Sequence, residues 1–188
     1  IFPHHWEQSL RESLFNITSI ISGTGYASVD YMTWGPFPIA IFLFTGLIRG
    51  CAGSTACSIK IFRYQLLFAS IRAQLQRIRS PHGVFTPRYD GRAISSDVMI
   101  SVMSFFMFFT LTRGLVAVAL SMTGLDCVTS ISGAAAALGN IGPGLGEIIG
   151  PAGNYSTLND PAKWILTAAM LIGRLELMAV YVILTFKF

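Results

Sequence analysis

The chain has 188 residues, of which 53% are apolar and 12% charged, with a formal net charge of +4 and a mean hydropathy of +0.60. A soluble domain carries roughly a quarter charged residues, so this composition argues against a soluble helical bundle with an apolar core and favours a protein embedded in membrane lipid. The positive charge is concentrated in one loop between apolar segments, a pattern that favours a topology signal over nucleic-acid binding.

The first predicted unit covers residues 1–80. It begins with a short pore helix at 6–21, which is too short to cross ~30 Å of hydrocarbon and has the length of a re-entrant segment. A glycine loop follows at 22–26, with the sequence Ser22-Gly23-Thr24-Gly25-Tyr26. A longer apolar helix is then expected over 36–70.

Small residues interrupt this longer helix, in the order Gly50-Cys51-Ala52-Gly53-Ser54-Thr55-Ala56-Cys57-Ser58. The part before the break, 37–48, would rise ~18 Å at 1.5 Å per residue, so the break lies near the middle of the membrane. Irregular backbone at that depth must face protein or water, because lipid offers it no hydrogen bonds. We therefore predict a gating loop here, with a simple helix kink as the alternative.

The basic residues indicate the orientation of the chain. Seven Lys and Arg side chains lie between the first and second apolar spans, accompanied there by a single acid, Asp90: they are Lys60, Arg63, Arg72, Arg77, Arg79, Arg88 and Arg92. Such a loop stays in the cytoplasm, and we assign 81–96 as the cytoplasmic loop. Three acids, Asp30, Asp126 and Glu147, then fall on the opposite side of the membrane, close to the glycine segments.

The second predicted unit, residues 97–188, repeats this order with an additional leading helix. We expect a long helix at 97–123, a pore helix at 127–138, a glycine loop at 139–146 and a last helix at 162–186. The corresponding leading helix of the first unit would precede Ile1, so we expect the chain to be a piece of something longer. The predicted fold class is an all-α, polytopic membrane protein built from helix–pore loop–helix repeats.

The glycine loops are the candidate site because of what a K⁺ ion requires. K⁺ gives up its water only if several carbonyl oxygens replace that water at similar energy. Turning successive carbonyls toward one axis needs backbone conformations that Gly25 and Gly142 adopt at little steric cost. The alternative is that these glycines only let helices pack closely. A nucleotide-binding function is disfavoured, since no strand precedes the loop at 139–146.

Several motifs in the same order resemble one family. They are Gly50-Cys51-Ala52-Gly53-Ser54-Thr55, Ile59-Lys60-Ile61-Phe62-Arg63, Asn140-Ile141-Gly142-Pro143-Gly144-Leu145-Gly146, Lys163-Trp164 and Met170-Leu171-Ile172-Gly173-Arg174-Leu175-Glu176. Together they closely resemble the membrane subunit of Trk-type potassium uptake systems, in the Trk/Ktr/HKT superfamily. The resemblance extends over essentially the whole chain.

This resemblance implies a pseudo-fourfold, K⁺-channel-like pore of four repeats, of which this chain supplies the incomplete third and the complete fourth. It implies K⁺ as the transported ion, a multi-pass location in the bacterial inner membrane, a homodimer, and a cytosolic ring of nucleotide-binding regulatory subunits. The N-terminal repeats of the same polypeptide would complete the pore. The implied filter residues are Thr24, Gly25, Tyr26, Asn140, Ile141 and Gly142. The implied gating residues are Gly50, Cys51, Ala52, Gly53, Ser54, Thr55, Ala56 and Arg174.

Two functional hypotheses follow. In the first, the chain is the C-terminal half of the pore-forming subunit of a K⁺ uptake system and catalyses no covalent chemistry. In the second, it is a truncated or split membrane module that conducts only when another chain completes the pore. A polytopic membrane enzyme is a weaker third hypothesis, since the sequence brings no cluster of acids, His or Cys toward a common point.

Overall fold

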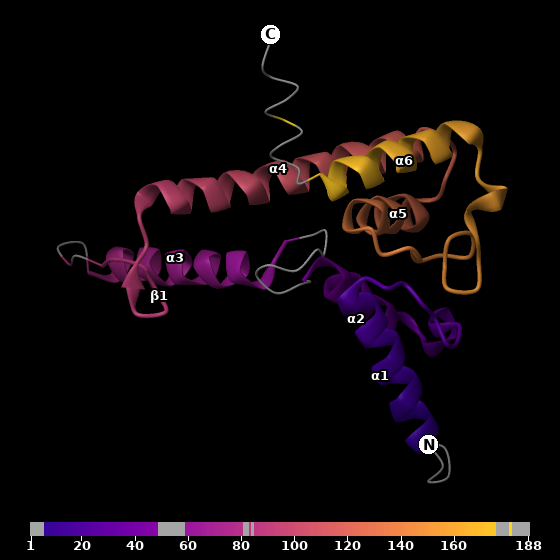
Figure 1. Cartoon of the computed structure of the whole chain (residues 1–188), viewed down its shortest axis with the longest axis horizontal. Helices are drawn as coiled ribbons and strands as arrows, with labels where there is room; N and C mark the ends of the chain where they lie inside the picture. Colours follow the sequence, from indigo (N-terminus) through magenta and orange to yellow (C-terminus); the bar gives the residue numbers. More distant parts are fainter. Residues whose placement is uncertain (1–5, 49–58, 81–82, 84, 176–180, 182–188) are drawn as a thin grey trace.

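The computed structural model describes residues 6–48, 59–80, 83, 85–175 and 181, and these are mostly helical. Helices α3 and α4 run side by side, α5 and α6 pack along the other half of α4, and α1 and α2 project away from this layer (Figure 1). The elements are α1 (Trp6–Ser22), the 3₁₀ helix η1 (Tyr31–Trp34), α2 (Pro36–Leu47), α3 (Ile61–Arg79), β1 (Arg88–Tyr89), β2 (Arg92–Ala93), α4 (Ser96–Ser121), α5 (Cys127–Gly139), the 3₁₀ helix η2 (Tyr155–Thr157) and α6 (Asp160–Arg174).

Local sequence explains where several helices begin and end. Asp126 caps α5, because its side chain accepts a hydrogen bond from the Thr129 amide at 3.1 Å. Asn140 ends the same helix in the left-handed conformation, with φ 50° and ψ 47°. Helices α2 and α6 each have a proline in their first turn, where the missing N–H costs nothing.

Small side chains let α4, α5 and α6 approach closely. Ala134, Ala162 and Ala169 are each 0% exposed within this cluster. The closest approach is at Gly173 of α6, where a Cβ would lie 2.2 Å from the Leu138 carbonyl oxygen of α5. Helices in lipid associate through such packing, because burying apolar surface away from lipid gains nothing.

A smaller cluster joins the two units of the chain. Ile20 of α1, Tyr31 of η1 and Phe42 of α2 pack with Leu145, which belongs to the loop after α5. Contacts between α2 and α5 continue this interface. The first unit is therefore seated against the glycine loop of the second.

Helix α4 is long and apolar enough to cross a membrane; with 26 residues it rises about 39 Å. It is the only such helix within the described residues, where α2 and α5 are shorter apolar helices. The other two expected long helices, 36–70 and 162–186, each include residues that lie outside the described part of the chain.

Two features differ from the sequence expectations, and a third can be followed only in part. Helix α3 continues to Arg79 instead of ending near 70, because its Arg, Gln, Ala and Leu residues are strong helix formers. The expected cytoplasmic loop contains a two-stranded hairpin whose turn residues, Asp90 and Gly91, both have positive φ. Helix α6 ends at Arg174, and most of the predicted last helix beyond it lies outside the described residues.

The close contact between α5 and α6 yields a stability prediction. Gly173→Ala should destabilise the complete gene product by about 1–3 kcal/mol, because the added Cβ overlaps backbone that has little room to move. Gly114→Ala in α4 is the matched control, since a Cβ there meets nothing within 4 Å. Thermal unfolding in detergent would measure both. Equal stability of the two variants would contradict the close packing.

Candidate functional site

The two predicted glycine loops meet in the fold. A Cβ on Gly25 would lie 2.0 Å from the Ile141 carbonyl oxygen, and a Cβ on Gly142 would lie 3.8 Å from the Gly25 Cα. Gly25 has φ +74° and Gly142 has φ +110°, conformations that disfavour any side chain. Glycine is therefore required at Gly25 by both conformation and space, and at Gly142 by conformation.

Each loop leaves the C-terminal end of a short helix. The Ser19 carbonyl of α1 accepts hydrogen bonds from the amides of Gly23 and Thr24 at 3.0 and 3.1 Å. The Ala136 carbonyl of α5 accepts one from the Ile141 amide at 2.9 Å. Helix C-termini carry a partial negative charge of about half an electron. Two such ends converge on the place where the loops meet, which makes it attractive to a cation.

A buried polar side chain holds each loop against its helix. Asn16, 1% exposed, donates to the Ser28 hydroxyl at 3.0 Å and accepts from the Ser28 amide at 3.1 Å. Ser132, 4% exposed, accepts from the Leu145 amide at 3.0 Å and donates to the Leu145 carbonyl at 2.8 Å. If the two loop sequences are aligned so that Gly25 matches Gly142, then Ser28 matches Leu145. In both units the buried side chain therefore binds the loop at the same aligned position.

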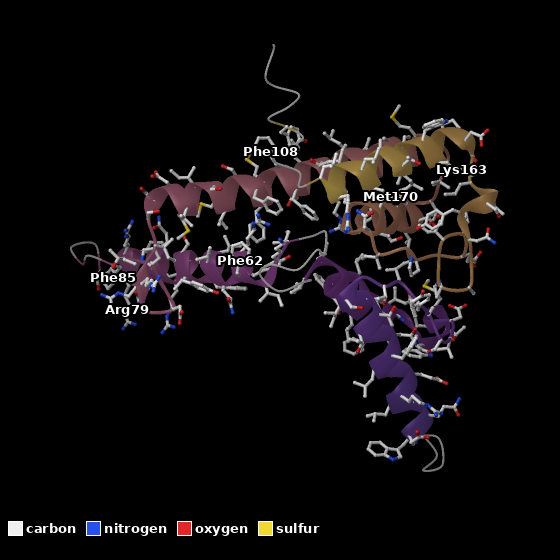
Figure 2. The ribbon with its side chains drawn as sticks, viewed as in Figure 1. Phe62, Arg79, Phe85, Phe108, Lys163 and Met170 are labelled. Carbon is white, nitrogen blue, oxygen red and sulfur yellow. The ribbon has the colours of Figure 1, made fainter. Side chains whose placement is uncertain are left out.

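The six predicted filter residues have different local roles. The Thr24 hydroxyl lies 3.1 Å from the Ser19 hydroxyl, so it turns back onto α1, whereas Tyr26 is 73% exposed. Ile141 is 8% exposed, and Asn140 donates to the Met170 carbonyl of α6 at 3.1 Å. Met170 is labelled on α6 in Figure 2. The Asn140 bond ties the second loop directly to the last described helix.

Two of the three acids expected near the loops also cap helices. Asp30 caps η1 by accepting from the Met32 amide at 3.0 Å, and Asp126 caps α5. Hydrogen bonds from Thr129 lower the pKa of the Asp126 carboxyl below its ordinary value, so this group stays ionised at neutral pH. Glu147 is exposed. Negative charge thus lies near both loops.

The predicted gating residues Gly50–Ala56 lie outside the described residues. The segments on either side of them are joined, by a parallel bridge between Ile48 and Ile59 and by the Tyr64 hydroxyl, which donates to the Leu47 carbonyl at 3.3 Å. Arg174, the last residue of α6, is exposed and follows directly on the contact between Gly173 and Leu138. It therefore lies near the end of α5 from which the second loop leaves.

Sequence reasoning missed three residues that shape the site. Asn16 lies next to the apolar run that ends α1, and Ser132 precedes the alanine run of α5. Both are buried polar side chains, which need hydrogen-bond partners, but the sequence by itself does not show that they are buried. Tyr155 of η2 donates its hydroxyl hydrogen bond to the Gly142 carbonyl. No local pattern identifies Tyr155, because the contact depends on how the chain returns from the second loop to α6.

Comparison with known proteins places this geometry in a family. A sequence model of the family described as TrkH, cation transport protein, matches residues 5–187. The Trk system potassium uptake protein TrkI of Halomonas elongata is 46% identical over 94% of the chain, and TrkH of Vibrio parahaemolyticus is 36% identical over 93%. The chain spans about 36% and 35% of the length of these two relatives.

A solved structure agrees with the sequence comparison. The crystal structure of the potassium transporter TrkH from Vibrio parahaemolyticus aligns over 95% of the chain and 38% of its own length, with a TM-score of 0.87 and 35% identity. The helical fold described above is therefore the fold of the matching part of that transporter. This chain belongs to the TrkH family of cation transport proteins.

Proposed function

We propose that the chain forms part of the ion pathway of a potassium transporter, with the loops 22–26 and 139–146 contributing two sides of a carbonyl-lined selectivity filter. The observation that supports this most strongly is the backbone contact between Gly25 and Ile141 at the ends of two short helices. Backbone oxygens held at helix C-termini can replace the water around a cation without binding it too tightly to leave.

The proposed pore needs more protein than this chain. Residues 1–80 and 97–188 would supply two of four helix–pore loop–helix repeats, the first without its leading helix. Two loops can surround only part of an ion, and the remaining carbonyls would come from two further repeats. Those repeats would belong to the same polypeptide or to a second chain.

We place the chain in the bacterial inner membrane, with residues 81–96 in the cytoplasm. Helix α4 supports this placement by its length and by its apolar surface, most of which faces outward. The basic residues from Lys60 to Arg92 support the orientation. They also give the cytoplasmic side a cationic surface, on which we propose that a nucleotide-binding regulatory subunit docks on a homodimer of the transporter.

For the gate we propose residues Gly50–Ala56 together with Arg174. The bridge between Ile48 and Ile59 supports this, because it brings together the two ends that flank the small-residue segment. Arg174 carries five N–H donors and a permanent charge. At the end of α6 it could hold loop carbonyls and oppose the passage of cations.

The first prediction from the proposed function concerns selectivity. Gly25→Ser and Gly142→Ser in the complete gene product should each reduce the preference for K⁺ over Na⁺ about tenfold, because a Cβ at positive φ costs roughly 1–2 kcal/mol and tilts the carbonyls. Gly91→Ser is the matched control, since Gly91 has φ +76° with no atom close to a Cβ. Rb⁺ and Na⁺ fluxes in liposomes would measure the ratio; unchanged ratios in both filter variants would remove these loops from the filter.

The second prediction concerns topology. In a background without Cys51, Cys57 and Cys127, a cysteine replacing Ser80 should be labelled by an impermeant thiol reagent only from the cytoplasm. One replacing Ser156, which is exposed on η2, should be labelled only from outside. Labelling in the reverse pattern would overturn the orientation.

The third prediction concerns the gate. Arg174→Ala should raise Rb⁺ flux and reduce its dependence on the regulatory subunit, because a charge and several donors that favour the closed state are lost. Deleting part of Gly53–Ala56 should act in the same direction. Arg11→Ala, which removes an exposed charge from α1 outside the proposed docking surface, should leave the flux and its dependence on the regulatory subunit unchanged. Lower flux from a well-inserted Arg174→Ala protein would assign the arginine to folding instead.

A further inference from the structure

We propose that Tyr155 is a positioning residue for the selectivity filter: its hydroxyl donates a hydrogen bond to the Gly142 carbonyl and sets the direction in which that carbonyl faces the ion. This inference rests on the proposed function, since it assigns a role at the same site. A carbonyl oxygen has two lone pairs, so the oxygen that accepts from Tyr155 can still contact a cation.

The filter loop needs such a support at Gly142. This residue has φ +110°, and a Cβ built on it would meet only the Gly25 Cα, at 3.8 Å. No neighbouring atom therefore packs tightly against the side of Gly142 where a Cβ would stand. A hydrogen bond to the Gly142 carbonyl is a direct way to hold that carbonyl in one direction.

Tyr155 itself is held firmly. The Asn154 side chain caps η2 by accepting from the Ser156 amide at 3.1 Å, and Lys163 of α6 donates to the Ser156 carbonyl at 3.2 Å. Lys163 is labelled at the start of α6 in Figure 2. The Tyr155 ring packs against the cluster formed by α4, α5 and α6. The donor is thus anchored to the helical layer and not to the filter loop.

The surroundings of Tyr155 keep its proton in place. Burial raises the pKa of the Tyr155 phenol to about 12, so the group remains a donor at every physiological pH. The pKa of the Tyr31 phenol in the first unit is also raised to about 12, first by burial, then by Asp30, and then by Tyr155. Tyr31 and Tyr155 are therefore close to each other. Tyr155 therefore lies at the junction of the two units.

A carbonyl of fixed direction affects discrimination between ions. K⁺ and Na⁺ differ in radius, and a filter that holds its oxygens at the K⁺ distance leaves the smaller ion poorly coordinated. If the Gly142 peptide can rotate, its carbonyl can follow the smaller ion or turn away from the path. Loss of the Tyr155 hydroxyl should then reduce selectivity more than it reduces total flux.

The test is Tyr155→Phe in the complete gene product, reconstituted in liposomes, with K⁺ and Na⁺ competition against Rb⁺ uptake. We expect the K⁺ preference over Na⁺ to fall about fivefold, which is the size of one hydrogen bond, with no dependence on pH between about 6 and 9. Tyr89→Phe is the matched control: it also removes one hydrogen bond, from Tyr89 to Gln65 at 3.0 Å, but in the cytoplasmic hairpin. Its selectivity should equal that of the wild type.

The outcomes separate this inference from the proposed function. Unchanged selectivity in Tyr155→Phe, alongside reduced selectivity in Gly142→Ser, would overturn the role of Tyr155 and leave the filter assignment intact. Unchanged selectivity in both variants would overturn the filter assignment itself. If Tyr155→Phe fails to insert, Asn154→Ala decides, because it removes the two side-chain hydrogen bonds to Ser156 at the start of η2 and leaves the Tyr155 hydroxyl in place. Selectivity equal to the wild type in Asn154→Ala would then reject the proposal.

Discussion

The structure depends on one backbone contact, between Gly25 in the loop after α1 and Ile141 in the loop after α5. Two loops with exposed carbonyls cannot lie side by side in a membrane unless something satisfies or supports those groups. Here each loop is supported from behind by a short helix and by one buried polar side chain, Asn16 or Ser132. This support holds the backbone of both loops in place where they meet.

The helical layer of α4, α5 and α6 carries this arrangement. Alanine and glycine at the helix contacts bring backbones close together, and Gly173 touches the last turn of α5. Two hydrogen bonds connect the second loop to this layer. Asn140 donates to the Met170 carbonyl of α6, and Tyr155, which packs on the layer, donates to the Gly142 carbonyl. A displacement of α6 would therefore act on the second loop through these two bonds. This provides a physical route between the proposed gate at Arg174 and the proposed filter.

Capping and charge serve the same loops. Asp30 and Asp126 start short helices, and each also adds negative charge near the loops. The hydrogen bonds that make Asp126 a good cap also lower its pKa and keep it ionised. The Asp126 carboxylate thus stabilises α5 and adds negative electrostatic potential at the start of that helix.

Composition and periodicity were sufficient to predict much of this protein. Long and short apolar segments located α1, α2, α4 and α5, because hydrophobic length is a local property of the sequence. Glycine density located both loops, since positive φ requires glycine almost regardless of surroundings. The hairpin at Arg88–Ala93 was not predicted, although the sequence contains a signal for it. Asp90-Gly91 is a dipeptide that favours a tight hairpin turn.

Tertiary structure decided what the loops touch. The pairing of Gly25 with Ile141, the anchoring of Ser28 by Asn16, and the bond from Tyr155 to Gly142 all join residues whose separation along the chain is not encoded in any local pattern. Long-range contacts arise from helix packing, which depends on the shapes of several surfaces at once. The sequence alone therefore determined where the long and short apolar segments lie and which loops can bend. The fold determined which carbonyls are held, and by which donor.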